Sequence, residues 1–443
     1  MMCAWKSVPA PDAAAGVSGE TASLAGVRSL VVQKYGGSSV ATAEKIRNVA
    51  KRIEVRLGAE ESCKLAVVVS AMGKTTDGLI ALAKEVSSRP PAREMDMLLA
   101  TGEQTSAALL AMALRSLGIE AVSRNAFQLG IVTSDNYSNA RIQDIDLSRL
   151  WHDFADHSVV VITGFQGVTA EGELTTLGRG GSDTSAVAIA AKALTTAEAG
   201  TLDVVCEIYS DVPGIFTCDP NKIKGARKLD YITYEEMLEL ASLGAKVLHM
   251  RSVELARKYG VTLYCASTFS EERGTYVVKE LPEWLECPVV TGVTVARKQM
   301  KFVVKRIPGN GDILSGIFQV LAQAGVNIDM ISTASDANLS FLTFTVLDGE
   351  AESVIRAVGD YMSERGLAGW EIEPGTPVAK VSAVGDGMNA ATGVAGRVFA
   401  ALRGRKIGIL GISTSDINIS VLVDGTRADE AVEALAEEFA LAE

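Results

Sequence analysis

The stretch that decides the fold is RSLVVQKYGGSS, residues 28–39. Its apolar first half predicts a buried strand over Arg28–Lys34, and a helical pattern follows over Ala41–Leu57. Consecutive glycines between a strand and a helix let backbone N–H groups approach phosphate oxygens, and the helix N-terminus adds a favourable dipole. Lys34 would place a positive charge beside those phosphates. The alternative is an ordinary strand-to-helix turn with a surface lysine.

The same alternation continues outward from this stretch. Near-continuous apolar runs occupy Leu65–Ser70, Val159–Thr163 and Asp203–Tyr209, and helical patterns begin near Thr76 and cover Ser185–Leu194. Apolar runs separated by helices predict a parallel sheet that is covered on both faces. Glycine-rich turns follow several of the runs, at the strand ends where open α/β sheets bind ligands.

Composition narrows the possible functions. The 443 residues suggest two to four domains, and 48% hydrophobic with 22% charged residues is typical of a globular protein. A net charge of -12 argues against nucleic-acid binding. We expect no membrane span, no zinc site among the scattered cysteines and a cytoplasmic location. Residues 1–27 are rich in Ala, Gly, Ser and Pro and are predicted to be a disordered extension.

The C-terminal third contains an internal repeat. Each unit has the pattern strand, helix, strand, strand, helix, and the two matching sets are Phe318, Leu321, Ile328 with Ile331–Thr333, and Phe399, Leu402, Ile409 with Ile412–Thr414. The first unit ends in a strand near Trp370–Ile372, whereas the second ends at its helix. A further strand over Val289–Val295 belongs to neither unit. We infer that it completes the second unit, so that the first unit is inserted within the second.

Two more turns have polar residues that suit ligand binding. Residues 176–184, TLGRGGSDT, precede a helix and carry Arg179, whose guanidinium is a two-pronged donor for a carboxylate. Ser182 or Asp183 would cap that helix, and a simple capped turn is the alternative interpretation. The turn at Ile208–Phe216 could hold a nucleotide base and ribose, but a plain loop explains it equally well.

Common nucleotide-binding motifs are absent. Gly73-Lys74-Thr75 resembles the end of a Walker A motif, but Val68 occupies the position of the upstream glycine. In the run from Gly178, Asp183 stands where a dinucleotide fingerprint needs its last glycine. Neither a P-loop enzyme nor a nicotinamide enzyme is therefore predicted.

The ordered set of motifs resembles the aspartate kinase family over about residues 28–443. The matching segments are Lys34–Ser39, Ser70–Gly73, Leu177–Asp183, Tyr209–Gly214, Glu235–Leu240, Gly244–Lys246 and the paired C-terminal units. The resemblance implies an α/β protein, with an amino-acid-kinase fold (a mostly parallel sheet with helices on both faces) followed by two ferredoxin-like ACT domains. The implied domains are 28–287 for catalysis, 299–374 for the inserted first ACT domain, and 288–298 plus 375–443 for the second.

The resemblance also implies the site residues. Lys34 and Asp183 would be catalytic, with Asp183 organising the lysine. The implied aspartate-binding residues are Thr75, Glu103, Arg141, Arg179, Gly180, Gly181 and Ser182. The implied ATP-binding residues are Lys34, Tyr35, Gly36, Gly37, Ser38, Ser210, Asp211, Phe216, Asn221, Lys246 and Val247. ATP and Mg²⁺ are the implied cofactors, and no protein side chain is assigned as a metal ligand.

The implied activity is transfer of the ATP γ-phosphate to the side-chain carboxylate of L-aspartate, the first step of lysine, threonine and methionine biosynthesis. The implied regulation is feedback inhibition by lysine, threonine or both, in a homodimer or higher oligomer that forms through the ACT domains. The implied effector residues are Asp312, Asn327, Ile328 and Asp329. At the matching strand of the second repeat, Leu410 stands where the first has Asp329, so we expect the first repeat to bind the effector.

Two departures from the family pattern concern the nucleotide. Phe216 replaces a frequent tyrosine, and Asn221 replaces a frequent arginine that would contact a phosphate. Two other functions stay open at this point: a related kinase acting on N-acetylglutamate, glutamate or a nucleoside monophosphate, and a non-catalytic amino-acid sensor. The presence of Lys34, Arg179 and Asp183 disfavours the sensor.

Overall fold

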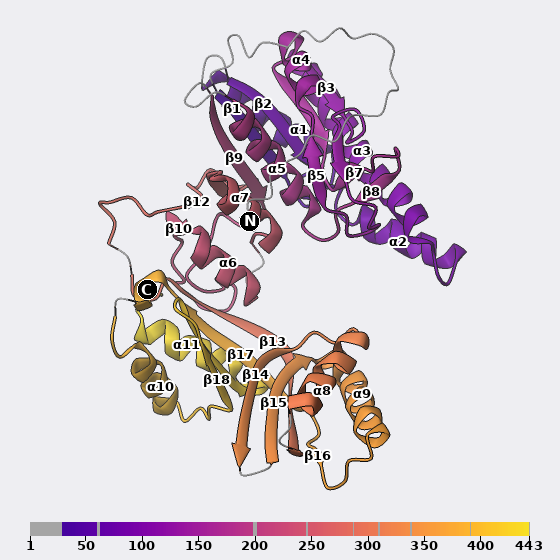
Figure 1. Ribbon diagram of the computed structural model, residues 1–443. Helices are drawn as coiled ribbons and strands as arrows, with labels where there is room; N and C mark the ends of the chain where they lie inside the picture. Colours follow the sequence, from indigo (N-terminus) through magenta and orange to yellow (C-terminus); the bar gives the residue numbers. More distant parts are fainter. Residues whose placement is uncertain are drawn as a thin grey trace. The chain divides into compact units, whose positions relative to one another are not determined.

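The computed structural model describes residues 29–59, 63–197, 202–244, 247–286, 288–308, 311–336, 339–389 and 391–442. The chain forms two compact units (Figure 1). The first contains the described residues of Met1–Ile215, Lys228–Ala241 and Lys246–Leu285, and the second those of Phe216–Arg227, Ser242–Ala245 and Glu286–Glu443.

An eight-stranded sheet forms the centre of the first unit, in the order β10-β12-β11-β9-β1-β2-β6-β3. Its strands are β1 (Ser29–Tyr35), β2 (Cys63–Val69), β3 (Ala121–Arg124), β6 (Val159–Thr163), β9 (Asp203–Ser210), β10 (Tyr231–Thr233), β11 (Leu263–Ser267) and β12 (Thr275–Val278). The six strands from β11 to β3 are parallel. The first apolar stretch of the sequence, β1, lies between β9 and β2, where burial on both faces explains its run of apolar residues.

Helices cover this sheet and bring functional residues to its edge. The helices of the unit are α1 (Ala43–Gly58), α2 (Thr75–Val86), α3 (Ala92–Ser116), α4 (Ser148–Asp156), α5 (Gly181–Thr196), α6 (Tyr234–Ser242) and α7 (Met250–Tyr259). Apolar side chains of α1 and α3 pack with alternate residues of β1, β2 and β6 in one core cluster. Helix α5 packs against β1, β9 and α7. A small four-stranded sheet adds β5 (Ile142–Ile145), β4 (Ile131–Thr133), β7 (Gln166–Val168) and β8 (Leu174–Thr176).

Among the described residues, α3 is the one helix whose length and composition would suit a membrane span. Half of its apolar window is buried in the protein. Its acidic residues Asp96 and Glu103 are buried as well, at 0% and 3% exposure. The helix therefore packs as a core element of the first unit.

The second unit is built on one sheet in the order β14-β15-β13-β17-β19-β18. Its strands are β13 (Gly292–Pro308), β14 (Asp329–Asp336), β15 (Leu339–Leu347), β16 (Glu371–Ile372), β17 (Thr376–Val384), β18 (Gly411–Thr414) and β19 (Asn418–Asp424). The long strand β13 serves both repeats, because its Gln299–Pro308 part pairs with β15 and its Gly292–Ala296 part pairs with β17. Both repeats therefore share one sheet through β13.

Each repeat of the second unit has its own helix pair and its own core. Helices α8 (Gly311–Gln323) and α9 (Ala351–Glu364) pack with the first repeat, and α10 (Val394–Gly404) and α11 (Ala428–Glu438) with the second. The predicted α/β fold class, with a mostly parallel sheet covered by helices and two ferredoxin-like repeats, is confirmed.

The segment Phe216–Arg227 belongs to the second unit, although the sequence division assigned every residue up to 287 to the catalytic domain. Cys218 and Ile223 are buried in the core of the second repeat. The Thr217 hydroxyl donates to the Leu441 carbonyl at 2.6 Å. The reason for the difference is tertiary, because the partners of this segment lie more than two hundred residues further along the chain.

Candidate active site

Lys34 and Asp183 form a largely buried ion pair at the end of β1. The Lys34 Nζ lies 2.6 Å from the Asp183 Oδ1, and the two side chains are 12% and 13% exposed. Asp183 belongs to the first turn of α5, which packs against the face of β1 that carries Lys34. The predicted pairing of these two residues is therefore present. It holds the Lys34 side chain in place at the edge of the sheet.

The glycine loop after β1 lies close to the loop after β2. A Cβ on Gly37 would lie 2.8 Å from the Ala71 carbonyl oxygen, so only glycine fits there. The Gly73 N–H donates to the Gly37 carbonyl at 2.9 Å, and the Ser70 N–H donates to the Tyr35 carbonyl at 3.1 Å. These contacts bring the segments Lys34–Ser39 and Ser70–Gly73 together at the carboxyl ends of the adjacent parallel strands β1 and β2. Ligands bind at this edge of open α/β sheets.

Glu103 on α3 is a buried carboxylate with one oxygen left unpaired. Its Oε1 accepts the Ala71 N–H at 3.0 Å, whereas its buried Oε2 has no hydrogen-bond partner in the described structure. Burial raises the pKa of Glu103 to about 7, against the opposing effect of the Ala71 N–H. An ammonium group at Oε2 would restore the ionised form. Glu103 thus has the geometry and charge of a site for an amino group.

The loop between β8 and α5 presents Arg179. Gly178 and Gly180 adopt φ angles of +77° and +68°, a conformation that favours glycine. Arg179 is exposed, and within the described ranges its side chain pairs with no other residue. Ser182 follows, and its side chain is buried beside Gly164. The predicted substrate loop therefore holds a free guanidinium on a backbone that glycines shape.

Asp96 anchors this loop and was missed in the sequence. Its carboxylate accepts hydrogen bonds from the backbone and hydroxyl groups of both Ser138 and Thr176, at 2.8 to 3.1 Å. It lies two helical turns before Glu103 on the same face of α3. That spacing was the available signal, since two acids on one face of an apolar helix point to a polar site.

A second missed cluster lies under the strand ends on the α1 side of the sheet. Gln33 donates to Glu207 at 2.7 Å, and the hydroxyl of Tyr209 donates to the same carboxylate oxygen at 3.0 Å. The rings of Tyr35 and Tyr209 stack at 5.0 Å, and the Arg52 guanidinium lies 4.6 Å from the Tyr209 ring centre. These contacts join the paired strands β1 and β9 on the face of the sheet that packs against α1, near the strand ends that carry Lys34 and Ser210. The sequence signal for this cluster was one polar residue, Gln33 or Glu207, within each otherwise apolar strand interior.

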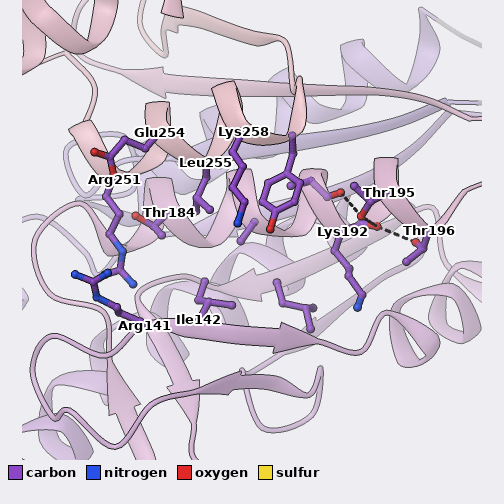
Figure 2. A pocket seen from close by; sticks show the side chains of 14 residues that line it. Arg141, Ile142, Thr184, Lys192, Thr195, Thr196, Arg251, Glu254, Leu255 and Lys258 are labelled. Carbon is purple, nitrogen blue, oxygen red and sulfur yellow. Dashed lines mark hydrogen bonds between the residues drawn. The ribbon is translucent and has the colours of Figure 1, made fainter. Parts of the chain in front are cut away.

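A groove of about 530 Å³ runs between α5, α7 and β5 (Figure 2). Ala188 and Leu255 are among its apolar lining residues, and Arg141 and Arg251 approach one another at one end. Arg251 donates to the carbonyl oxygens of Leu177 and Ala140 at 2.9 and 2.7 Å. The predicted substrate residue Arg141 thus lies beside Arg251, behind the loop that carries Arg179.

The remaining predicted residues divide between the two units. Thr75 is exposed at the start of α2, and its hydroxyl donates to the Met72 carbonyl at 2.6 Å. Ser210 ends β9, Asp211 is exposed just after it, and Val247 is half-buried before α7. Phe216 and Asn221 lie in the segment that belongs to the second unit. Lys246 lies outside the described residues.

The predicted effector residues occupy the first repeat of the second unit. Asp312 is in the first turn of α8, Asn327 and Ile328 precede β14, and Asp329 begins it. The Asp329 carboxylate forms an ion pair with Lys380 of β17, whose side chain is 10% exposed. No local pattern in the sequence predicts that an ammonium of the chain itself pairs with Asp329.

The described residues contain no group of three or more His, Cys, Asp or Glu side chains arranged to hold a metal ion. Asp183 pairs with Lys34 at the end of β1, and Asp211 follows the end of the adjacent strand β9. A divalent cation that accompanies a nucleotide would fit this site by taking most of its ligands from phosphate oxygens and water.

Comparison with known proteins defines the class. Residues 29–267 match the model of the amino acid kinase family, and residues 381–439 match an ACT domain model. The first unit, with its glycine loop and its Lys34–Asp183 pair, is accordingly an amino acid kinase unit. An aspartokinase from Bacillus sp. (strain MGA3) is 44% identical over 414 residues, covering 93% of this chain and 97% of the relative. One from Mycolicibacterium smegmatis is 44% identical over 422 residues, covering 93% and 96%. The chain belongs to the aspartokinase family.

Solved structures agree in fold. Escherichia coli aspartokinase III in complex with aspartate and ADP is 24% identical, with a TM-score of 0.70 over 92% of this chain and 99% of that chain. The same enzyme in complex with lysine and aspartate gives a TM-score of 0.69 at 24% identity, over 93% and 99%. The predicted enzyme class, a phosphotransferase that acts on aspartate, is confirmed by the relatives.

Proposed function

We propose that this aspartate kinase transfers the γ-phosphoryl group of ATP to the side-chain carboxylate of L-aspartate, giving 4-phospho-L-aspartate and ADP. The observation that carries the proposal is the buried Glu103, whose Oε2 has no partner. An unpaired buried oxygen costs about 1–3 kcal/mol, which a bound ammonium would recover. N-acetylglutamate and nucleoside monophosphates, the substrates of related kinases, have no free ammonium that could pair with Glu103.

The substrate is oriented by opposite charges at its α-carbon. Glu103 accepts the ammonium, and Arg179 binds the α-carboxylate through its two-pronged guanidinium. The glycine backbone at 180–181 and the Ser182 and Thr75 hydroxyls complete the site. With the α-substituents held, the β-carboxylate points to the phosphate loop. Positioning of this kind supplies much of the rate enhancement in phosphoryl transfer.

Phosphoryl transfer needs no general base, because the attacking carboxylate is already ionised at neutral pH. One of its oxygens forms the new bond to the γ-phosphorus while the bond to the β,γ-bridging oxygen breaks, and the electron pair leaves with ADP. Lys34 neutralises charge on the transferring group, and the amides of residues 36–38 contact the phosphates. ATP would also use Tyr35, Ser210, Asp211, Phe216, Asn221, Lys246 and Val247. Mg²⁺, when bound with ATP, supplies further charge neutralisation.

Regulation is proposed to act through the ACT repeats. The aspartokinase III relative binds lysine, and the acidic Asp329 in the first repeat suits an effector ammonium. Asp312, Asn327 and Ile328 would line the same site, with lysine or threonine as effector. We further propose that the enzyme forms a homodimer that pairs these sheets and that it is cytoplasmic. Its reaction would be the first step of lysine, threonine and methionine biosynthesis.

The test is a coupled ADP-release assay with ATP and a panel of carboxylates. L-Aspartate should support turnover, whereas N-acetyl-L-aspartate, which lacks the ammonium, should not. A Glu103→Gln variant should lose the preference for the free amino group. Equal turnover of aspartate and its N-acetyl form by the native enzyme would disprove the role of Glu103.

A further inference from the structure

The start of α7 contacts the substrate loop at two places, through the side chains of Arg251 and of His249, the residue before the helix. Arg251 donates Nη1 to the Leu177 carbonyl and Nη2 to the Ala140 carbonyl, at 2.9 and 2.7 Å. Leu177 leads directly into the glycines around Arg179. Ala140 in turn donates its N–H to the Thr176 carbonyl at 2.9 Å. One guanidinium therefore joins the two chain segments that flank the predicted aspartate site.

The second contact is the ring of His249, which precedes α7. A Cβ on Gly180 would lie 2.1 Å from the His249 Cγ, so the ring lies directly against the loop backbone. The His249 backbone is fixed to the start of α7, because its carbonyl accepts the Ser252 N–H at 2.9 Å and the Ser252 hydroxyl at 2.6 Å. Arg251 and His249 thus fix the loop from one rigid element, at residues 177 and 180.

Arg251 is held by carbonyl dipoles rather than by a carboxylate. Burial lowers the pKa of its guanidinium, and the neighbouring charge of Arg141 lowers it further. Figure 2 shows the two guanidinium groups facing each other at the end of the groove. Arg251 is half-buried, and although the charge of Glu254 partly opposes these effects, no carboxylate of the described residues forms an ion pair with it, so its cationic form is costly. Its two carbonyl bonds are the compensation that the structure provides.

We propose that Arg251 is a positioning residue for the substrate loop, which clamps its backbone together with His249 so that Arg179 is presented to the aspartate α-carboxylate. The proposal rests on the proposed role of that loop in aspartate binding. Arg251 bonds backbone carbonyls beside the loop and not Arg179 itself, so the proposed effect on aspartate binding is indirect. Loss of the clamp leaves the chemistry of Lys34 and Asp183 intact and weakens aspartate binding.

The groove makes a chemical rescue experiment possible. In Arg251→Ala, the KM for aspartate should rise about tenfold or more, because the two charge-assisted hydrogen bonds that join the loop to the Ala140 segment are lost. The kcat and the KM for ATP should change less than threefold. Guanidinium ion at tens of millimolar should restore much of the aspartate KM, since the groove beside the vacated site is open to a molecule of that size.

Three controls separate positioning from general stability. Arg257→Ala removes an exposed arginine from the same helix and should behave like the native enzyme, with or without guanidinium. Tetramethylammonium, a cation without N–H donors, should not rescue Arg251→Ala. Arg251→Lys keeps the charge but reaches one carbonyl at a time, so its KM should be intermediate; it also replaces the alanine variant if that variant does not fold.

Hydrogen exchange in the free enzyme tests the clamp without any substrate. Backbone amides of residues 174–182 should exchange faster in Arg251→Ala, and guanidinium should slow them again. Native exchange in this loop together with a native aspartate KM would overturn the proposal. Faster exchange with an unchanged aspartate KM would support the role of Arg251 in holding the loop but refute the role of the loop in aspartate binding. The failure of the further inference and the failure of the proposed function are therefore distinguishable.

Discussion

The phosphate side and the amino-acid side of the catalytic unit differ in how their charges are satisfied. On the phosphate side, Lys34 and Asp183 already form an ion pair. On the amino-acid side, Arg179 is unpaired within the described ranges and one oxygen of Glu103 is buried without a partner. A preformed pair keeps a catalytic charge in place, whereas unpaired groups recover energy only when the right substrate arrives.

The regulatory unit resembles the phosphate side in this respect. Its candidate effector acid, Asp329, pairs with Lys380 across the two repeats. An effector ammonium would therefore have to compete with a side chain of the protein. This contrast between Glu103 and Asp329 predicts different responses to substitution in the two units.

The largest effect is expected on the phosphate side. Lys34→Ala should lower kcat by roughly 10³-fold, because the charge that stabilises the transferring phosphoryl group is removed. Aspartate affinity, measured by calorimetry with a non-hydrolysable ATP analogue, should change little. The exposed Lys84→Ala serves as the control. Near-native turnover in a folded Lys34→Ala protein would show that the preformed pair is structural.

On the amino-acid side, Arg179→Ala should raise the KM for aspartate by roughly 10–100-fold, through loss of the charge-assisted contact to the α-carboxylate. The KM for ATP should stay within a few-fold of the native value. Steady-state kinetics with each substrate varied would measure both. A larger effect on ATP than on aspartate would assign this loop to the nucleotide.

The pH dependence tests Glu103 directly. Its pKa is raised from 4.5 to about 7, so the acid is largely protonated at pH 6 and cannot pair with an ammonium. We expect kcat/KM for aspartate to rise with pH and to level off above about 7, and Glu103→Gln to abolish this limb of the profile. A profile that is unchanged in Glu103→Gln would assign the titration to another group.

Stability should respond in the opposite direction to the same group. A carboxyl whose pKa is raised on folding takes up a proton when the chain folds. Its contribution to stability is full below about pH 4.5 and is lost as the pH rises through about 7. Thermal unfolding of the free enzyme should therefore show this pH trend. Saturating aspartate should reduce the trend, because the ammonium stabilises the ionised form.

The smallest effect on uninhibited turnover is expected in the regulatory unit. Asp329→Ala should weaken inhibition by about 5–150-fold, the usual range of coupling between sites, without changing uninhibited turnover. Lys380→Met should strengthen inhibition, since it frees the Asp329 carboxylate for the effector. Inhibition titrations with lysine, threonine and their mixture would measure both variants. If Lys380→Met instead weakens inhibition, the ion pair is part of the effector site and not its competitor.

The sequence by itself determined the features that depend on local chemistry. The apolar run before Lys34 specifies a central strand, because a strand that is buried on both faces has no place for alternation. Gly37 and the glycines around Arg179 occupy turn positions that only glycine fits without strain or close contact. The internal repeat predicted two paired units. The extra strand over Val289–Val295 predicted that the first unit is inserted within the second. Lys34, Arg179 and Asp183 stand in these glycine-rich motifs, whereas Glu103 was identified only through the resemblance to aspartate kinases.

Tertiary structure decided the features that depend on partners far away in the chain. Asp96 is one acid among many until folding brings Ser138 and Thr176 to it. Residues 216–227 join the second unit because their apolar side chains find a core there. Arg251 holds the substrate loop, and Lys380 pairs with Asp329, through contacts that no local pattern encodes. Burial and hydrogen bonding act between residues that meet in space, so their consequences follow only from the fold.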